Sequence, residues 1–148
     1  MERAIAVMMF AAVMVSGCGS NTAKKSSAEE PVHITFGHGQ AEGHPYHIAA
    51  LQFKKEVEKK TDHRVIVDVQ PNGNLGDERE MTEGLQLGTI DITVAVAATL
   101  SGFDSDLDVF NFPYLFDSRE EAFKVLDGKT GQKIFKGLEK QGIETLTE

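Results

Sequence analysis

Residues 71–91, which read PNGNLGDEREMTEGLQLGTID, decide the fold. The opening PNGN is turn chemistry, because proline fixes φ and both asparagine and glycine tolerate left-handed backbone. Asp77 followed three residues later by Glu80 has the pattern of a capping box, so a helix is expected over residues 77–87. The apolar run after that helix predicts a buried parallel strand over residues 90–96. Turn, helix and strand in this order favour an α/β fold.

The sequence before this stretch repeats the same alternation. Strands are predicted over residues 32–37 and 64–69, with a helix over residues 45–60 between them. The order is βαβαβ, which indicates one α/β domain. Each helix should bury one stripe of side chains, at Tyr46, Ala49, Ala50, Phe53 and Val57 in the first and at Met81, Gly84, Leu85 and Gly88 in the second.

The sequence after residue 101 predicts further elements. A strand is expected over residues 108–112, and Ser118 with Glu121 indicates a second capping box. Two helices should follow, each ended by a glycine with positive φ, and then a strand, with boundaries at Gly128, Gly142 and Ile143. An aromatic run alternates at every second residue and is expected to pack in the core, although the same spacing would suit a stacking platform; it comprises Phe110, Phe112, Tyr114 and Phe116.

Three blocks of sequence, in order, resemble one receptor family. They are GHPYHIAALQF at residues 43–53, the stretch at residues 71–91, and FNFPYLF at residues 110–116. Together they resemble the DctP-type solute receptors of tripartite ATP-independent periplasmic (TRAP) transporters, across residues 31–148. The resemblance implies a lobe of the periplasmic-binding-protein type II kind, with a βαβαβ sheet flanked by helices. It also implies capture of a small organic acid, a C4-dicarboxylate or a sugar acid, for a TRAP membrane permease, without a cofactor.

The family has a second lobe that closes over the ligand, with an arginine that pairs with the ligand carboxylate. Neither matches any residue of this sequence, so residues 31–148 are expected to form an N-terminal lobe without its second lobe. Bidentate arginine pairing is strong when it is desolvated. The chain alone is therefore expected to bind its ligand weakly or not measurably.

Composition excludes several classes of function. The net charge is −8 and the pI is near 5.1, which leaves no basic excess to neutralise phosphates and argues against nucleic-acid binding. The sequence contains no G-x-S-x-G motif, no phosphate-binding glycine loop and no cysteine placed as a nucleophile. We therefore expect a protein that is not an enzyme.

The amino terminus predicts a membrane anchor. An apolar run over residues 4–14 leads into Val-Ser-Gly and then Cys18, which resembles the lipobox of lipoprotein signal peptides. Residues 1–17 are then a signal peptide, because the apolar run is shorter than the roughly 20 residues of a membrane span. Residues 18–30 would be a lipidated cysteine and a flexible tether, placing the domain outside the cytoplasm. A plain secretory signal and a buried cysteine are the alternatives.

Candidate ligand contacts lie in the loops after the three strands, because α/β sheets bind ligands beyond the carboxyl ends of their strands. The first loop offers His38, Gln40 and His44, and the second offers Glu78, at a position where related receptors place an acidic ligand contact. The third loop offers the backbone around Val96, Ala97 and Thr99. Each of these residues also has a structural explanation. Glu78 would complement the dipole of its helix, and the histidines would be ordinary polar residues of a loop or a helix cap.

Two other classes of function stay open. A metal-binding or sensor lipoprotein would use the cluster His33, His38, His44 and His47, although no cysteine or tight carboxylate pair completes a ligand set. A receptor for an ATP-driven importer would have the same kind of fold but would lack the sequence blocks at residues 71–80 and 87–91.

Overall fold

The computed structural model describes residues 30–146, so the predicted signal peptide, Cys18 and nearly all of the tether lie outside the described residues. The first half contains β1 (Val32–Gly37), α1 (Pro45–Lys60), β2 (Val65–Gln70), α2 (Glu78–Leu87) and β3 (Ile92–Thr93). The second half contains α3 (Ala97–Leu100), the 3-10 helix η1 (Ser105–Asn111), α4 (Arg119–Leu126), α5 (Lys129–Phe135) and the 3-10 helix η2 (Leu138–Gln141).

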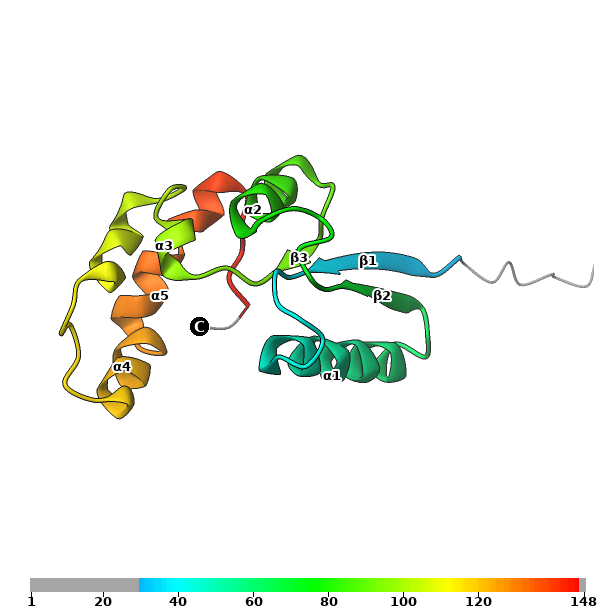
Figure 1. The fold of residues 1–148 in the computed structure, drawn as a ribbon, viewed down its shortest axis with the longest axis horizontal. Coiled ribbons are helices and arrows are strands. Elements are labelled where there is room, and N and C mark those ends of the chain that lie inside the picture. The colour runs from blue at the N-terminus through cyan, green and yellow to red at the C-terminus, as the bar shows by residue number, and fades with distance from the viewer. Residues whose placement is uncertain (1–29, 147–148) are drawn as a thin grey trace, which may run out of the picture.

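The predicted βαβαβ order forms a parallel sheet with strand order β2-β1-β3. β1 is central and pairs with β2 along its whole length, from Val32 opposite Val65 to Gly37 opposite Gln70. α1 covers one face of the sheet and α2 lies over the other (Figure 1). The strands all run toward the half of the molecule that contains α3, α4 and α5 (Figure 1).

Each face of the sheet has its own packing partner. On the α1 side, Phe36 and Val67 pack against Ala50 in a buried cluster. On the α2 side, Gly37 faces Met81, and a Cβ on this glycine would lie 2.8 Å from the Met81 sulfur. The absence of a side chain at Gly37 is therefore what lets α2 approach the central strand.

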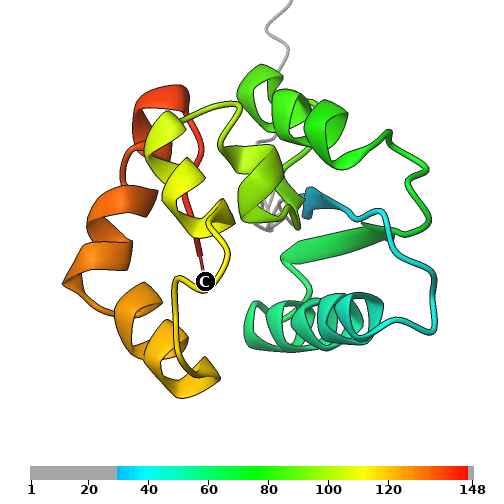
Figure 2. The ribbon, with the colours of Figure 1, turned by 60° about the vertical axis from the view of Figure 1, so that its left-hand side comes forward.

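The helices of the second half surround a separate small core (Figure 2). Leu107, Leu138 and Ile143 are buried together, and half-buried side chains from α3 and α5 pack around them. α4 and α5 are joined by Gly128, which caps α5 with φ −83° and lies close to the Lys124 carbonyl. The prediction of positive φ was wrong for Gly128 and is confirmed for Gly142, which has φ 78°.

The predicted helix stripes are confirmed only where the sheet lies beneath them. Ala50 is buried and Phe53 and Val57 pack against its cluster, but Tyr46 and Ala49 are exposed. Tyr46 lies in the first turn of α1, where its ring meets His44 instead of the sheet. In α2, Met81 and Gly84 are buried and Leu85 is half-buried, whereas the fourth member, at residue 88, is the exposed left-handed C-cap.

The third strand is much shorter than the predicted range of residues 90–96. β3 pairs with β1 only through Ile92 and Thr93, because β1 ends at Gly37 and offers no partner beyond that point. Before the strand, the Thr35 backbone N–H donates to a carboxylate oxygen of Asp91 at 2.7 Å. A side chain thus replaces one backbone hydrogen bond of the expected ladder.

Two other strand predictions were wrong. Residues 108–112 lie mostly in the 3-10 helix η1, because Asp104 caps it by accepting from the Asp106 backbone N–H at 3.0 Å. No strand begins at Ile143 within the described residues; its side chain is buried in the second core.

The capping box predicted at Ser118 is half confirmed. The Ser118 hydroxyl accepts from the Glu121 backbone N–H. The Glu121 carboxylate, however, accepts from the backbone N–H of Asp117, one residue before Ser118.

The aromatic run does not pack as a unit. Phe110 stacks on Phe135 with ring centroids 5.6 Å apart, so its predicted core role is confirmed. Phe112 and Tyr114 are 65% and 99% exposed, respectively, which contradicts the core prediction for them. Tyr114 also has φ 57°, so the backbone at this loop turns in the left-handed region and directs the ring outward.

Candidate functional site

The loops after β1, β2 and β3 meet at the carboxyl edge of the sheet, where α/β proteins place their ligands. Backbone hydrogen bonds join the first two loops. The His38 N–H donates to the Gln70 carbonyl at 3.0 Å, and the Gly73 N–H returns to the His38 carbonyl at 3.1 Å. The Asn72 N–H donates to the Gln40 carbonyl at 3.0 Å. The start of the first loop is therefore fixed to the second.

His38 is fully buried at the end of β1. Its Nδ1 accepts from the Gln40 backbone N–H at 3.3 Å, and its Nε2 lies 3.1 Å from Nδ1 of His47 on α1. Burial, followed by the neighbouring His47 and His44 rings, lowers the pKa of His38 below its ordinary value. His38 is therefore neutral at neutral pH, and both of its ring nitrogens are engaged.

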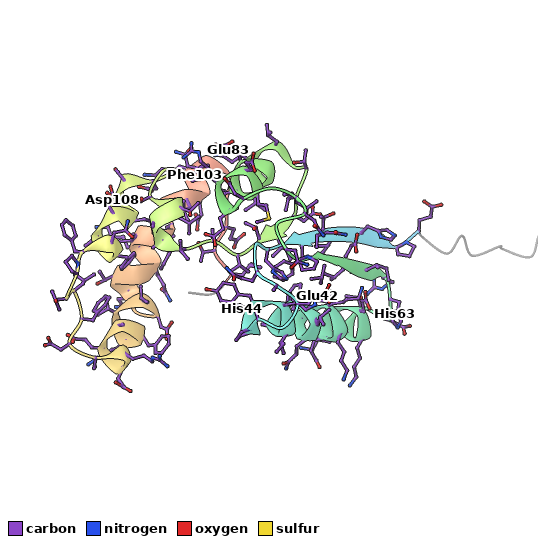
Figure 3. The ribbon with its side chains drawn as sticks, in the orientation of Figure 1. Glu42, His44, His63, Glu83, Phe103 and Asp108 are labelled. Atoms are coloured by element: carbon purple, nitrogen blue, oxygen red, sulfur yellow. The ribbon has the colours of Figure 1, made fainter. Side chains whose placement is uncertain are left out.

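His44 caps α1, as the structural alternative proposed. Its Nδ1 accepts from the Tyr46 backbone N–H at 3.2 Å, and the two rings meet edge to face at 4.7 Å. Between Gln40 and His44 the chain forms an exposed turn at residues 41–43, and Figure 3 shows Glu42 and His44 on this loop. The Gln40 side chain is half-buried.

Glu78 connects the second loop to the third. One carboxylate oxygen, Oε2, accepts from the Val96 backbone N–H at 3.1 Å and from the Thr99 hydroxyl at 3.2 Å. Ala97 lies between these two donors as the first residue of α3. The predicted residues of the second and third loops are thus in contact, and the contact gives Glu78 a structural task beyond its place in the first turn of α2.

The capping box of α2 sets the position of Glu78. The Glu80 N–H donates to Asp77 Oδ1, and the Asp77 N–H donates to Glu80 Oε2, both at 2.8 Å. The predicted box is confirmed, and it starts the helix so that Glu78 is its first residue. The side chain then lies within reach of α3.

The four-histidine cluster does not assemble as a unit. His33 is exposed on β1, five residues before His38, and this separation corresponds to about 17 Å along a strand. Among residues 30–146, no three His, Cys, Asp or Glu side chains are grouped to hold a metal ion. The structure does join His38 to His47, a pair that sequence spacing alone had not singled out.

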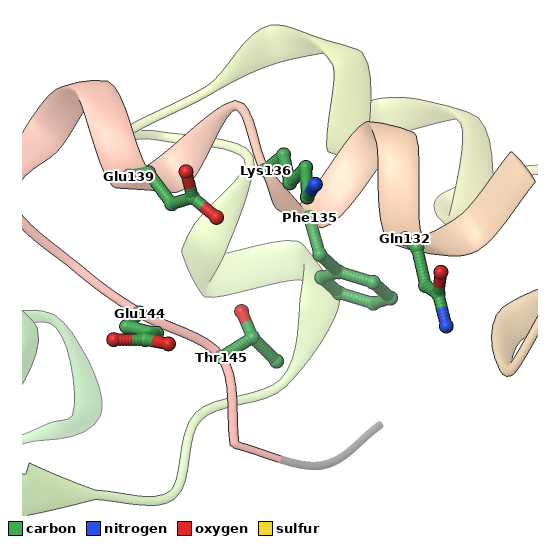
Figure 4. A pocket seen from close by; sticks show the side chains of 6 residues that line it. All are labelled: Gln132, Phe135, Lys136, Glu139, Glu144 and Thr145. Atoms are coloured by element: carbon green, nitrogen blue, oxygen red, sulfur yellow. The ribbon is translucent and has the colours of Figure 1, made fainter. Parts of the chain in front are cut away.

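Hollows elsewhere on the surface are lined by other residues. One of about 200 Å³ lies beside α5 and the C-terminal segment (Figure 4). It is lined by Gln132, Phe135, Lys136, Glu139, Glu144 and Thr145, none of them a predicted ligand contact. Within residues 30–146, no helix is both long and apolar enough to span a membrane.

Comparison with known proteins identifies the family. Residues 36–148 match the model of DctP, the bacterial extracellular solute-binding protein family 7. The chain belongs to this family. The match includes every predicted ligand contact, and it confirms the family predicted from the three sequence blocks.

Relatives of the DctP family share both sequence and fold with this chain. The C4-dicarboxylate-binding periplasmic protein DctP of Rhodobacter capsulatus is 36% identical over 121 residues, covering 79% of this chain and 35% of its own length. The sugar acid binding protein DctPAm of Advenella mimigardefordensis, solved with galactonate, superposes with a TM-score of 0.77 at 32% identity, covering 80% of this chain and 38% of that protein.

A third relative binds a similar compound. It is a TRAP periplasmic solute binding protein from Haemophilus influenzae with bound L-gulonate, with a TM-score of 0.72 at 38% identity, covering 78% of this chain and 38% of that protein. These likenesses confirm the predicted α/β receptor lobe. The chain spans little more than a third of the length of each of these relatives.

Proposed function

We propose that this chain forms part of a receptor that captures a small organic acid outside the cytoplasm for a TRAP membrane permease. The observation that carries the proposal is the meeting of three polar loops at the carboxyl edge of a DctP-family sheet. Relatives of the same fold hold galactonate and L-gulonate. The proposed contact set is His38, Gln40, His44, Glu78, Val96, Ala97 and Thr99.

The chemistry of the loops favours a sugar acid over a dicarboxylate. In a neutral His44 ring, Nδ1 accepts from Tyr46, so the proton lies on Nε2, where it can be donated to a ligand carboxylate. On the other side, Oε1 of Glu78 has no hydrogen-bond partner among the described residues and can accept from a ligand hydroxyl. A second ligand carboxylate at Glu78 would be repelled, because like charges at close range disfavour each other.

Binding can be tested directly on the isotope-labelled chain. D-galactonate, L-gulonate and succinate would be titrated separately while amide NMR shifts of Gln40, His44 and Glu78 are recorded. We expect these amides to shift with both sugar acids and less with succinate, and a matched Glu78→Gln variant should lose the preference. Amide shifts as large with succinate as with the two sugar acids would contradict the preference for a sugar acid.

We further propose that residues 1–17 are removed and that Cys18 carries a lipid, leaving residues 18–30 as the tether of a domain formed by residues 31–148. Support comes from the Val-Ser-Gly-Cys order at the end of the apolar run. Mass spectrometry of the membrane-bound protein should find an acylated N-terminal peptide starting at Cys18. A Cys18→Ala variant that stays equally membrane-bound would contradict the anchor.

A further inference from the structure

β2 is an edge strand of the sheet, and alternate residues of this strand point their backbone groups away from β1. The carbonyls of Arg64 and Gln70 accept hydrogen bonds from the chain of β1 at 2.9 and 3.0 Å, so the even-numbered residues face β1. The odd-numbered residues therefore direct their N–H and C=O groups toward the free edge; they are Val65, Val67 and Val69. Unpaired groups of this kind are a template for pairing with another chain.

Side chains of α1 bind the outward groups of this edge. The Val67 N–H donates to Glu58 Oε1 at 3.2 Å, and the Lys54 ammonium group donates to the Val67 carbonyl. Three residues after Glu58, the Thr61 hydroxyl accepts from the Val65 N–H at 3.2 Å. Val67 is fully buried, although it lies in the middle of the outermost strand. Its outward backbone groups are therefore closed to water and to another chain.

The two charged groups also bind each other. Lys54 Nζ lies 2.9 Å from the same Glu58 oxygen. Hydrogen bonds from Lys54 and then from Val67 lower the pKa of Glu58 below its ordinary value, so its carboxylate is charged at neutral pH. The other ion pair of this helix, between Glu56 and Lys60, is longer at 3.9 Å and more exposed. Position on the helix thus separates a pair that binds the sheet edge from a pair that faces solvent.

The strand at this edge is suited to pairing with itself. It reads VIVDVQ, and β-branched side chains favour extended structure. In an antiparallel pair of two copies with a twofold axis at Val67, each Val67 would exchange both backbone hydrogen bonds with the other. Asp68 would lie opposite Ile66 of the second copy, so like charges would not face each other. The groups exchanged in such a pair are the ones that α1 binds.

We propose that Lys54, Glu58 and Thr61 form an edge guard, a set of α1 side chains that prevents β2 from pairing with β2 of a second copy of this chain. Backbone groups that are already bound inside the domain must first be released before another chain can use them. This role goes beyond the proposed function, because the guarded positions lie along β2, before the loop that leads to the proposed contacts.

The double variant Lys54→Ala/Glu58→Ala removes the charged part of the guard in the full chain. Its matched control, Glu56→Ala/Lys60→Ala, removes the other ion pair of the same helix, and both variants keep the original net charge. Hydrogen exchange at the Val67 amide would be followed by NMR in dilute and in concentrated protein. In dilute guard variant this amide should exchange about tenfold faster or more, the effect of losing one hydrogen bond to a charged group.

Concentration then distinguishes pairing from mere exposure. In concentrated guard variant the Val67 amide should regain protection, because a second copy supplies the acceptor, and sedimentation velocity should show a shift toward the dimer. The control should match the original chain in both measurements. A guard variant with the mass distribution of the control at every concentration would overturn the proposal. So would a Val67 amide that never regains protection.

Two further measurements separate pairing from unfolding. The Asp68 amide faces β1, so it stays protected in the guard variant while the sheet is intact. Thr61→Val removes only the hydroxyl that binds Val65 and changes no charge, so the Val65 amide should exchange faster in dilute protein and recover in concentrated protein. If the double variant loses protection at Asp68, Thr61→Val decides: a Val65 amide without this concentration dependence would refute the guard.

Discussion

Glu78→Ala should loosen the connection between α2 and α3 and lower the stability of the domain by about 2 kcal/mol. The substitution removes the single oxygen that accepts from both Val96 and Thr99. A hydrogen bond to a charged group contributes roughly 1.5–3 kcal/mol. Glu78 is only half-buried, so water replaces part of what is lost, and the two bonds together should cost near the value of one.

Glu78→Gln provides the comparison that isolates the charge. A glutamine can place its carbonyl oxygen where Oε2 now lies, which keeps both donors paired but with neutral bonds of roughly 0.5–1.5 kcal/mol. We therefore expect a loss of about 1 kcal/mol. In a domain of about 100 residues, 1 kcal/mol shifts Tm by at least about 4 °C. The two variants should melt about 8 °C and 4 °C below the original chain.

Circular dichroism melts would measure these shifts, with Glu83→Ala as the matched control. Glu83 lies on the same helix and is joined to Arg79 by an exposed ion pair of 3.0 Å, which should contribute about 0.5 kcal/mol or less. If Glu78→Ala and Glu83→Ala have the same Tm, the Glu78 carboxylate does not stabilise α3 and the reasoning is refuted. Amide hydrogen exchange at Val96 would locate the effect, because its protection depends on the Glu78 carboxylate.

Three further perturbations test the framework of the site. Met81→Ala should lower the free energy of unfolding in urea by about 2–5 kcal/mol, because the side chain is fully buried against the central strand. Met81→Leu should lower it by less than about 1.5 kcal/mol. Equal losses in the two variants would contradict tight packing at this position. Asp77→Ala should cost about 1 kcal/mol and Asp77→Asn much less, since asparagine also caps helices; a neutral alanine variant would argue against the capping box. The lowered pKa of His38 means that the unfolded chain binds more protons than the folded chain just below pH 6.5. The free energy of unfolding should therefore fall as the pH drops from 6.5 toward the folded pKa. His38→Gln should flatten this part of the stability–pH curve, and an unchanged curve would show that another group causes the dependence.

The sequence predicted the fold best where the signals are local. The bounds of β1 and α1 agree residue for residue with their predicted ranges, because a proline at the start of α1 and alternating apolar residues mark both elements without reference to the rest of the chain. α2 begins one residue later than predicted, at Glu78, since Asp77 is its cap. The positions of the candidate loops followed from this order.

The sequence failed where distant contacts decide the outcome. The length of β3 depends on where β1 ends, and the exposure of Tyr46 depends on where the sheet stops beneath α1. The pairing of His38 with His47 was equally hidden, because nine residues and a turn separate them. Sequence spacing suggested His44 and His47 as a pair on one helix face, but only the fold shows that the fully buried ring of His38 lies 3.1 Å from His47.

The exposed turn at residues 41–43 has a practical consequence. Its two ends are fixed, since the Gln40 carbonyl is bound by the Asn72 N–H and His44 caps α1, yet Glu42 between them faces solvent. Cys18 is the only cysteine in the sequence, so Glu42→Cys combined with Cys18→Ser would give a single thiol between Gln40 and His44 of the proposed contact set. An environment-sensitive dye on that thiol would convert ligand capture into a fluorescence signal and make the receptor an optical sensor for its own solute.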